Sequence, residues 1–139
     1  MTHLTESFSV PDGQASWAAI NDLNKLIPCV PGAKVTATES ATKATAEITV
    51  KMGSMSMVFT GPVEIVSTSG TTAQIKANTR EKGGQSNAAG DVTIAVSGNQ
   101  VDVTADANVS GKAASMGEGT TVAVLTQLVK QFAGNLAKA

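Results

Sequence analysis

The C-terminal segment Lys112–Ala137 is the one long part of the chain whose apolar residues follow a helical period. These residues recur at steps of three and four, so that one face of a helix would carry Val122, Leu125, Leu128, Val129, Phe132 and Leu136. Most of the preceding chain alternates apolar and polar residues, which is the period of a half-buried strand. The two patterns together predict one long helix packed on one sheet.

The strand pattern occurs in seven segments, which are Leu4–Val10, Val35–Glu39, Lys43–Met52, Met55–Val63, Ala73–Asn78, Val92–Val96 and Val101–Val109. Each segment places apolar side chains on one face and polar side chains on the other. This is the pattern of an antiparallel sheet that is covered on one side only. The predicted fold class is therefore α+β, with a curved antiparallel sheet wrapped on the long C-terminal helix.

The N-terminal part of the chain adds a short helix and an apolar turn. Asp12 can cap this helix, and Pro28 would end it. The apolar positions of the helix are Trp17, Ile20, Leu23 and Leu26. The turn that follows is unusually apolar for a loop and contains Ile27, Pro28, Cys29 and Val30. We expect this turn to be a lid or docking surface, or else a plug that completes the core.

Composition narrows the class of protein. The 139 residues are enough for one domain, charged residues make up only 15%, and the net charge is -1. A nucleic-acid-binding domain normally has a basic excess, so no nucleic-acid partner is expected. Cys29 is the only cysteine and cannot form an internal disulfide, which fits a reducing, cytoplasmic location. No signal peptide is expected, and no segment approaches the roughly 20 apolar residues that span a bilayer.

Candidate catalytic and metal-binding groups are scarce. His3 is the only histidine and lies in the first few residues, so a Ser/His/Asp or Cys/His site is not expected. One histidine and one cysteine are too few ligands for a zinc site. Asp102 and Asp106 lie on the polar face of a predicted strand, where carboxylates normally face solvent. The sequence therefore predicts neither a catalytic nor a metal site.

Three groups of residues resemble the motifs of a known family. The first group is Phe8-Ser-Val10, Trp17, Asn21-Asp22-Leu23 and Cys29-Val-Pro-Gly32. The second is Lys51-Met-Gly53 followed by Phe59-Thr-Gly61, and the third is Gly111-Lys-Ala-Ala-Ser-Met-Gly117. In this order they resemble the CoxG family of carbon monoxide dehydrogenase subunits. The architecture likewise resembles the helix-grip fold of the START and Bet v 1 (SRPBCC) superfamily.

The resemblance implies an accessory protein and not an enzyme. Members are associated with the aerobic, molybdenum-containing carbon monoxide dehydrogenase, which has large, medium and small subunits. They are linked to its attachment at the cytoplasmic membrane and to electron delivery to the respiratory chain. Many relatives carry a linker and a hydrophobic anchor after this domain. This sequence stops at Ala139 without such a segment, so we expect a single helix-grip domain, residues 1–139, which either reaches the inner face of the membrane as a peripheral protein or belongs to a longer chain that carries the anchor.

Small and flexible residues on the inward faces predict an apolar cavity between the sheet and the final helix. The candidate lining residues are Trp17, Leu26, Met55, Met57, Phe59, Ile75, Ala77, Ile94, Val103, Ala105, Leu125, Val129 and Phe132. Helix-grip relatives commonly enclose lipids or other apolar molecules in this place. The mobile carrier of a respiratory membrane is a quinone, so the resemblance leads to a non-covalently bound quinone, such as menaquinone, as the expected ligand.

Three alternatives stay open on the sequence. The same residues could form a filled core without a cavity. The protein could be a small helix-grip enzyme of polyketide cyclase type, or a ligand-free assembly factor for the dehydrogenase. A cyclase needs titratable groups inside its cavity, whereas most inward positions here are Ala, Val, Ile and Met.

Overall fold

The computed structural model describes residues 2–52, 55–84, 86–111 and 118–138. These residues form a seven-stranded antiparallel sheet with the order β1-β7-β6-β5-β4-β3-β2. The strands are β1 (Thr2–Ser9), β2 (Ala33–Ser40), β3 (Lys43–Met52), β4 (Met55–Ser69), β5 (Thr72–Glu81), β6 (Asn87–Ser97) and β7 (Gln100–Ser110). The helices are α1 (Gly13–Ile20), α2 (Leu23–Leu26), the 3₁₀ turn η1 (Ile27–Cys29) and α3 (Glu118–Leu136).

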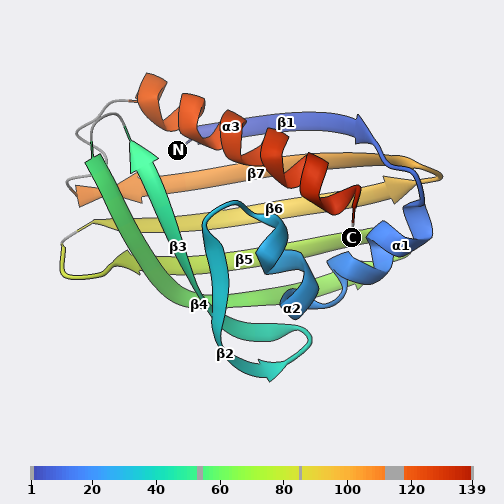
Figure 1. The fold of residues 1–139 in the computed structure, drawn as a ribbon, viewed down its shortest axis with the longest axis horizontal. Coiled ribbons are helices and arrows are strands. Elements are labelled where there is room, and N and C mark those ends of the chain that lie inside the picture. The colour runs from blue at the N-terminus through green and yellow to red at the C-terminus, as the bar shows by residue number, and fades with distance from the viewer. Residues whose placement is uncertain (1, 53–54, 85, 112–117, 139) are drawn as a thin grey trace.

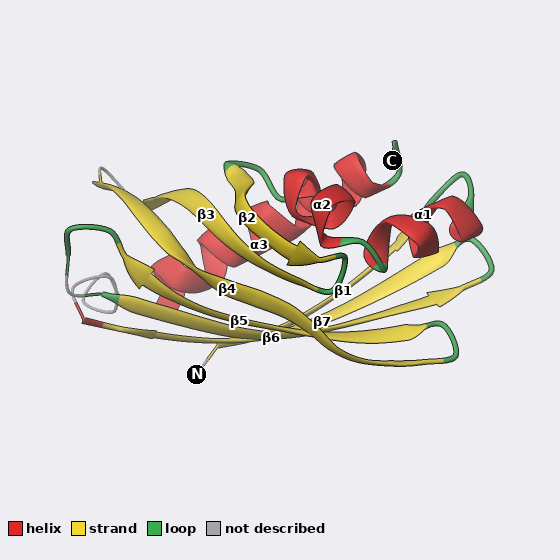
Figure 2. Cartoon of the chain, turned by 90° about the horizontal axis from the view of Figure 1, so that it is seen from below, coloured by secondary structure: helices red, strands yellow, loops and turns green. Residues whose placement is uncertain are grey.

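The sheet is curved, and all the described helices lie on its concave face (Figures 1 and 2). Figure 1 shows α3 running beside β1 and across the neighbouring strands, with its C-terminal end close to α1. The predicted α+β class and the curved sheet under a C-terminal helix are confirmed. The predicted helix included residues 112–117, which lie outside the described residues.

The prediction of one N-terminal helix was wrong, because two capping residues divide that segment. The Asp12 side chain accepts hydrogen bonds from the backbone N–H groups of Gln14 and Ala15, at 3.0 and 3.2 Å, and so begins α1 as expected. Asp22 accepts from the N–H of Asn24 at 3.0 Å and begins α2 as a separate helix. The apolar residues keep their helical spacing across Asp22, but this N-cap starts a new helix. Pro28 lies after α2, in the 3₁₀ turn η1.

The buried core has two parts at different ends of the sheet. The larger part gathers residues of α1, α2 and η1 on the strands, and Ile20, Leu23 and Val101 in it are completely buried. Phe132 and Leu136 bring the C-terminal half of α3 into this larger core. The smaller part centres on Met57 and Phe59 of β4. Because the two parts are separate, α3 is tightly packed at its C-terminal end only.

Gly61 allows β4 to bend close to β5. A Cβ atom at this position would overlap the backbone carbonyl oxygen of Asn78, which lies on β5. Pro62 follows and has no backbone N–H to donate, which suits an interruption in the strand pairing. The β4–β5 register has no pairs between Thr60–Arg80 and Val63–Ala77. The bend turns the first half of β4, with its partner β3, toward the helical layer (Figure 2).

None of the described helices is at once long enough and apolar enough to cross a bilayer. The longest of them, α3, spans 19 residues and carries polar side chains on its exposed face.

We expect Gly61→Ala to lower the free energy of unfolding by about 1–3 kcal/mol, because the new methyl group meets backbone that cannot rotate away. The matched control is Gly134→Ala in α3, where a Cβ atom meets nothing within 4 Å. This change should stabilise the helix by about 0.5–1 kcal/mol. Urea unfolding measures both variants, and equal effects at the two positions would contradict the close approach at Gly61.

Candidate ligand pocket

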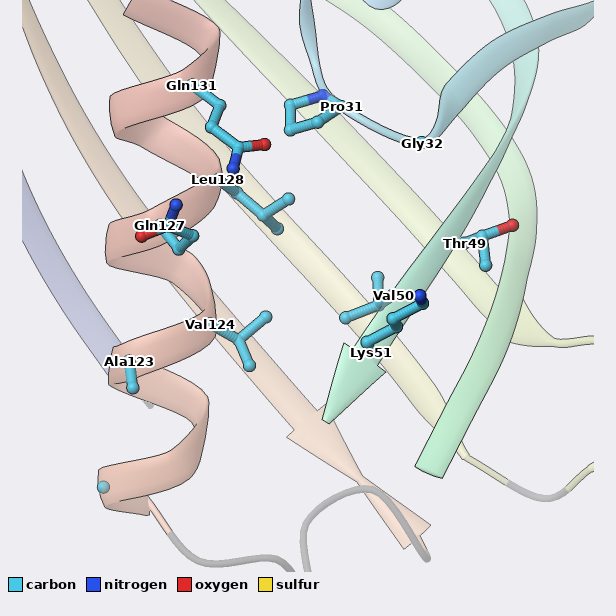
Figure 3. Close-up of a pocket in the computed structure, with 11 residues that line it drawn as sticks. Pro31, Gly32, Thr49, Val50, Lys51, Ala123, Val124, Gln127, Leu128 and Gln131 are labelled. Carbon is cyan, nitrogen blue, oxygen red and sulfur yellow. The ribbon is translucent and has the colours of Figure 1, made fainter. Parts of the chain in front are cut away.

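A pocket of about 760 Å³ lies between α3 and the end of β3. Figure 3 shows the helix on one side of it, and β3 with the Pro31–Gly32 turn on the other. The lining residues are Pro31, Gly32, Thr49, Val50, Lys51, Gly119, Ala123, Val124, Gln127, Leu128 and Gln131. Its volume lies within the range of roughly 300–1,000 Å³ that small-molecule sites occupy.

The pocket exists because β2 pairs with only part of β3. The pairing ends at Ala33 opposite Ile48, and the Gly32 carbonyl oxygen then accepts the Thr49 N–H at 3.0 Å. Gly32 has a positive φ of 80° and its Cβ would approach the Thr49 carbonyl oxygen at 2.7 Å, so this turn requires glycine. Beyond this turn, the edge of β3 faces α3 and not another strand.

The pocket has an apolar floor. Val50 of β3 and Val124 of α3 pack on the smaller core formed by Met57 and Phe59. The side chains of Val124 and Leu128 extend from α3 toward β3 (Figure 3). The pocket is therefore apolar on the side that faces the smaller core.

The rim of the pocket is polar. Gln127 and Gln131 lie one turn apart on α3 and are both exposed. The Gln131 side chain extends toward Pro31 on the opposite wall (Figure 3). Lys51 contributes the β3 side of the rim and is exposed as well. A ligand with an apolar body and a polar end would therefore match the pocket from floor to rim.

The predicted cavity residues are distributed over both parts of the core and the space between them. The larger core contains Leu26, Ile75, Ile94, Val103 and Phe132, with the half-buried Trp17 packed on it. Met57 and Phe59 form the smaller core, and the side chain of Met55 is outside the described part of the chain. Leu125 and Val129 are half-buried on α3, while Ala77 and Ala105 lie on the inward face of the sheet.

None of these predicted residues is among those that line the pocket at the β3 edge. The lining residues on α3 include Val124 and Leu128, each one position before the predicted Leu125 and Val129. Helical periodicity identifies the apolar face, but the small rotation that decides which neighbour meets a gap depends on how the helix packs. The signal available in the sequence was the Pro31-Gly32 pair, which marks the turn where β2 begins.

The residues predicted as a lid or docking surface come directly before the Pro31–Gly32 turn that lines the pocket. Ile27 and Cys29 are buried in the larger core, Val30 is half-buried against it, and Pro28 is exposed. The Asn135 side chain of α3 donates a hydrogen bond to the Cys29 carbonyl oxygen at 2.8 Å. This turn therefore holds the C-terminal end of α3, and a docking role for it stays a prediction.

Two carboxylates share the inward face of the sheet; the alternation of the first strand already placed Glu6 in line with Leu4 and Phe8, whereas Glu81 lay beyond the predicted strand Ala73–Asn78. Glu6 pairs with the buried Val103 and lies between Leu4 and Phe8 on the inward face of β1. Glu81 pairs with the buried Phe59 near the end of β5. Both side chains are half-buried, and Glu6 has no hydrogen-bond or ion-pair partner among the described residues.

No group of three or more metal-ligating side chains occurs within the described ranges. His3 lies on the polar face, where its Nδ1 atom is 2.6 Å from the Asp106 carboxylate. A second hollow, of about 670 Å³, lies on this polar face and is bordered mainly by charged and amide side chains. Its borders include Lys76 and Asp91, whose charged groups are 3.9 Å apart.

The family model for the CoxG subunit of carbon monoxide dehydrogenase matches residues 7–139. The chain belongs to this family. The match covers the end of β1, strands β2 to β7, the pocket residues and α3, and the family's name associates its members with carbon monoxide dehydrogenase. No curated protein matches the chain by sequence.

Solved structures share the fold at low sequence identity. A conserved protein from Geobacillus kaustophilus is 18% identical with a TM-score of 0.77, over 98% of this chain and 91% of that chain. The Zhui aromatase/cyclase from Streptomyces sp. R1128 is 10% identical with a TM-score of 0.68, over 99% and 92%. A START superfamily protein from Mycobacterium smegmatis is 15% identical with a TM-score of 0.62, over 98% and 97%. These likenesses confirm the START-like fold of this CoxG family member.

Burial raises the pKa of the Cys29 thiol above its ordinary value of 9.0. In the unfolded chain the thiol ionises first as the pH rises, so the folded state loses stability above about pH 9. Below that pH the thiol is protonated in both states, so the stability of the fold does not depend on its ionisation there. Between about pH 8 and 10 the free energy of unfolding, measured with urea, should fall more steeply with rising pH for the wild type than for Cys29→Ala. Parallel curves would contradict the burial of this thiol.

Proposed function

We propose that this protein is a non-catalytic accessory protein of aerobic molybdenum carbon monoxide dehydrogenase and that it binds a respiratory quinone, such as menaquinone. In this proposal it recruits the dehydrogenase to the inner face of the cytoplasmic membrane as a peripheral protein. The quinone ring lies at the rim of the pocket, where the partner enzyme can reach it. The isoprenoid tail lies between α3 and the sheet, and the bound quinone accepts the electrons.

The observation that carries this proposal is the pocket itself, together with family membership. It has an apolar floor, a polar rim and a volume of about 760 Å³, and it opens between the helix and the sheet. Quinones combine a ring bearing polar oxygens with an apolar tail, which is the same division of polarity.

In this proposal the tail lies over small residues on the inward face of the sheet. Ala77 pairs with Gly90, and Gly90 pairs with Ala107, so three neighbouring strands carry almost no side-chain volume at one level of the sheet. Leu125 and Val129 of α3 are only half-buried, as expected of side chains that a ligand would cover. Burial of the tail against such a surface would stabilise the complex by about 25 cal/mol for each Å² of apolar area.

Leu128→Trp tests the pocket, because an indole group at this position would fill the space between α3 and β3. We expect the variant to fold and to lose at least tenfold in affinity for menaquinone. Val122→Trp is the matched control, since Val122 is exposed on the same helix and does not line the pocket. Tryptophan fluorescence titration and mass spectrometry of solvent extracts measure bound quinone. Absence of quinone or lipid from the wild type after incubation with membranes would overturn the proposal.

A polyketide cyclase-like activity is the second candidate, and the inward carboxylate of Glu6 supports it. A positioned carboxylate could act as a general base on a substrate enclosed beneath α3. If this were the function, Glu6→Gln would abolish cyclisation of a poly-β-ketone substrate while leaving the fold intact. The accessory role instead predicts no cyclisation by the wild type and unchanged quinone binding by this variant. A ligand-free assembly factor would bind the dehydrogenase equally well after Leu128→Trp.

A further inference from the structure

The edge of β3 beside the pocket presents both a hydrogen-bond donor and an acceptor. Thr49 directs its N–H toward Gly32, on the side of β3 away from β4. The backbone groups of residues two apart on a strand point to the same side, so the Lys51 N–H and C=O also point away from β4. β2 does not extend to Lys51, so neither group has a ladder partner within the described residues.

The Lys51 side chain belongs to a different face. Side chains alternate between the two faces of the sheet along β3, and the buried Ala44 and Ala46 mark the inward face. Lys51 is an odd number of residues from both, so its side chain lies on the outward face with those of Lys43 and Glu47. The main chain of Lys51 therefore borders the pocket while its ammonium group follows the polar face of the sheet. The β3 wall is thus polar at this point through an uncharged amide unit.

The opposite wall has the same chemical character. The Gln131 carboxamide extends over the pocket from α3, and it has no hydrogen-bond partner within the described residues. A carboxamide carries an NH₂ donor and a carbonyl acceptor, and rotation of its last bond exchanges them. Both walls can consequently donate to an oxygen atom or accept from a hydroxyl group without any change in charge.

We propose that these two amide units make the pocket bind both redox states of a ring with two opposed oxygens. In the oxidised ring the oxygens are carbonyls and only accept, so the Lys51 N–H and the Gln131 NH₂ donate. Addition of two electrons and two protons converts both carbonyls to hydroxyls, which can donate to the Lys51 C=O and the Gln131 carbonyl oxygen. A charged side chain in either place would favour one state.

This inference rests on the proposed function, because it assigns the head-group contacts of the same pocket. It requires no electron transfer by this chain, whose role is to hold the ring. The partner dehydrogenase would supply the electrons, and solvent at the open rim would supply the protons. The predicted consequence is that binding leaves the reduction potential of the ring nearly unchanged.

The test uses the whole chain and three probes of matched shape, namely 2-methyl-1,4-naphthoquinone, its hydroquinone kept under anaerobic dithionite, and 2-methylnaphthalene. We expect wild-type dissociation constants for the quinone and the hydroquinone within about threefold of each other. Lys51→Pro removes the main-chain donor at an edge where proline is tolerated. It should weaken quinone binding about 2- to 10-fold relative to Lys51→Ala, which keeps the N–H. Binding of 2-methylnaphthalene should not change.

Gln131→Glu replaces the carboxamide by a group that only accepts, so it should weaken quinone binding and spare the hydroquinone. The ratio of the two dissociation constants should move about 2- to 10-fold, while Gln131→Leu should weaken both forms together. This ratio decides the inference even if Lys51→Pro fails to fold. If the wild type binds all three probes and the ratio of the quinone and hydroquinone dissociation constants is the same in Gln131→Glu as in the wild type, the inference is overturned and the proposed function still stands. Failure of every probe to bind the wild type would overturn the inference, whereas the proposed function stands or falls on binding of menaquinone with its tail.

Discussion

The structure depends on the attachment of α3 at its C-terminal end. Leu136 is completely buried, and Asn135 donates a hydrogen bond to the Cys29 carbonyl oxygen at 2.8 Å. Burial of a leucine side chain stabilises a fold by about 1.5–3 kcal/mol, and the hydrogen bond fixes the helix end to the η1 turn. Before Phe132, no described side chain of α3 is fully buried. One end of the helix is thus part of the core, while the other leaves space above the sheet.

That space becomes a pocket because of two features of the sheet. The bend of β4 at Gly61 turns β3 toward the helical layer, and β2 ends its pairing at Ile48. Beyond Thr49, whose N–H is bonded to the Gly32 carbonyl oxygen, the main-chain groups of Lys51 on this side of β3 have no ladder partner within the described residues. An unpaired strand edge normally invites association with another chain. Here the same unpaired groups border a pocket, which gives an otherwise apolar site a polar rim without buried charge.

Much of the architecture was predictable from residue patterns. The alternation from Lys43 to Met52 predicted a strand with the bounds that β3 has, and Gly98-Asn99 marked the hairpin between β6 and β7. The errors came from local chemistry that competes with periodicity. Asp22 caps a new helix within the apolar period of the N-terminal segment, so one predicted helix is two. Glu6 occupies an inward position that periodicity assigns to an apolar residue.

The sequence by itself determined which faces are buried, because a period of two or 3.6 residues encodes the inward side of each element. It also determined family membership, through motifs spread along the chain. Only the tertiary structure decided where the pocket lies. Its walls come from Pro31–Gly32, the end of β3 and α3, which are distant in sequence. Their meeting depends on a strand register, a bend at Gly61 and the rotation of α3, and none of these follows from the pattern of one segment.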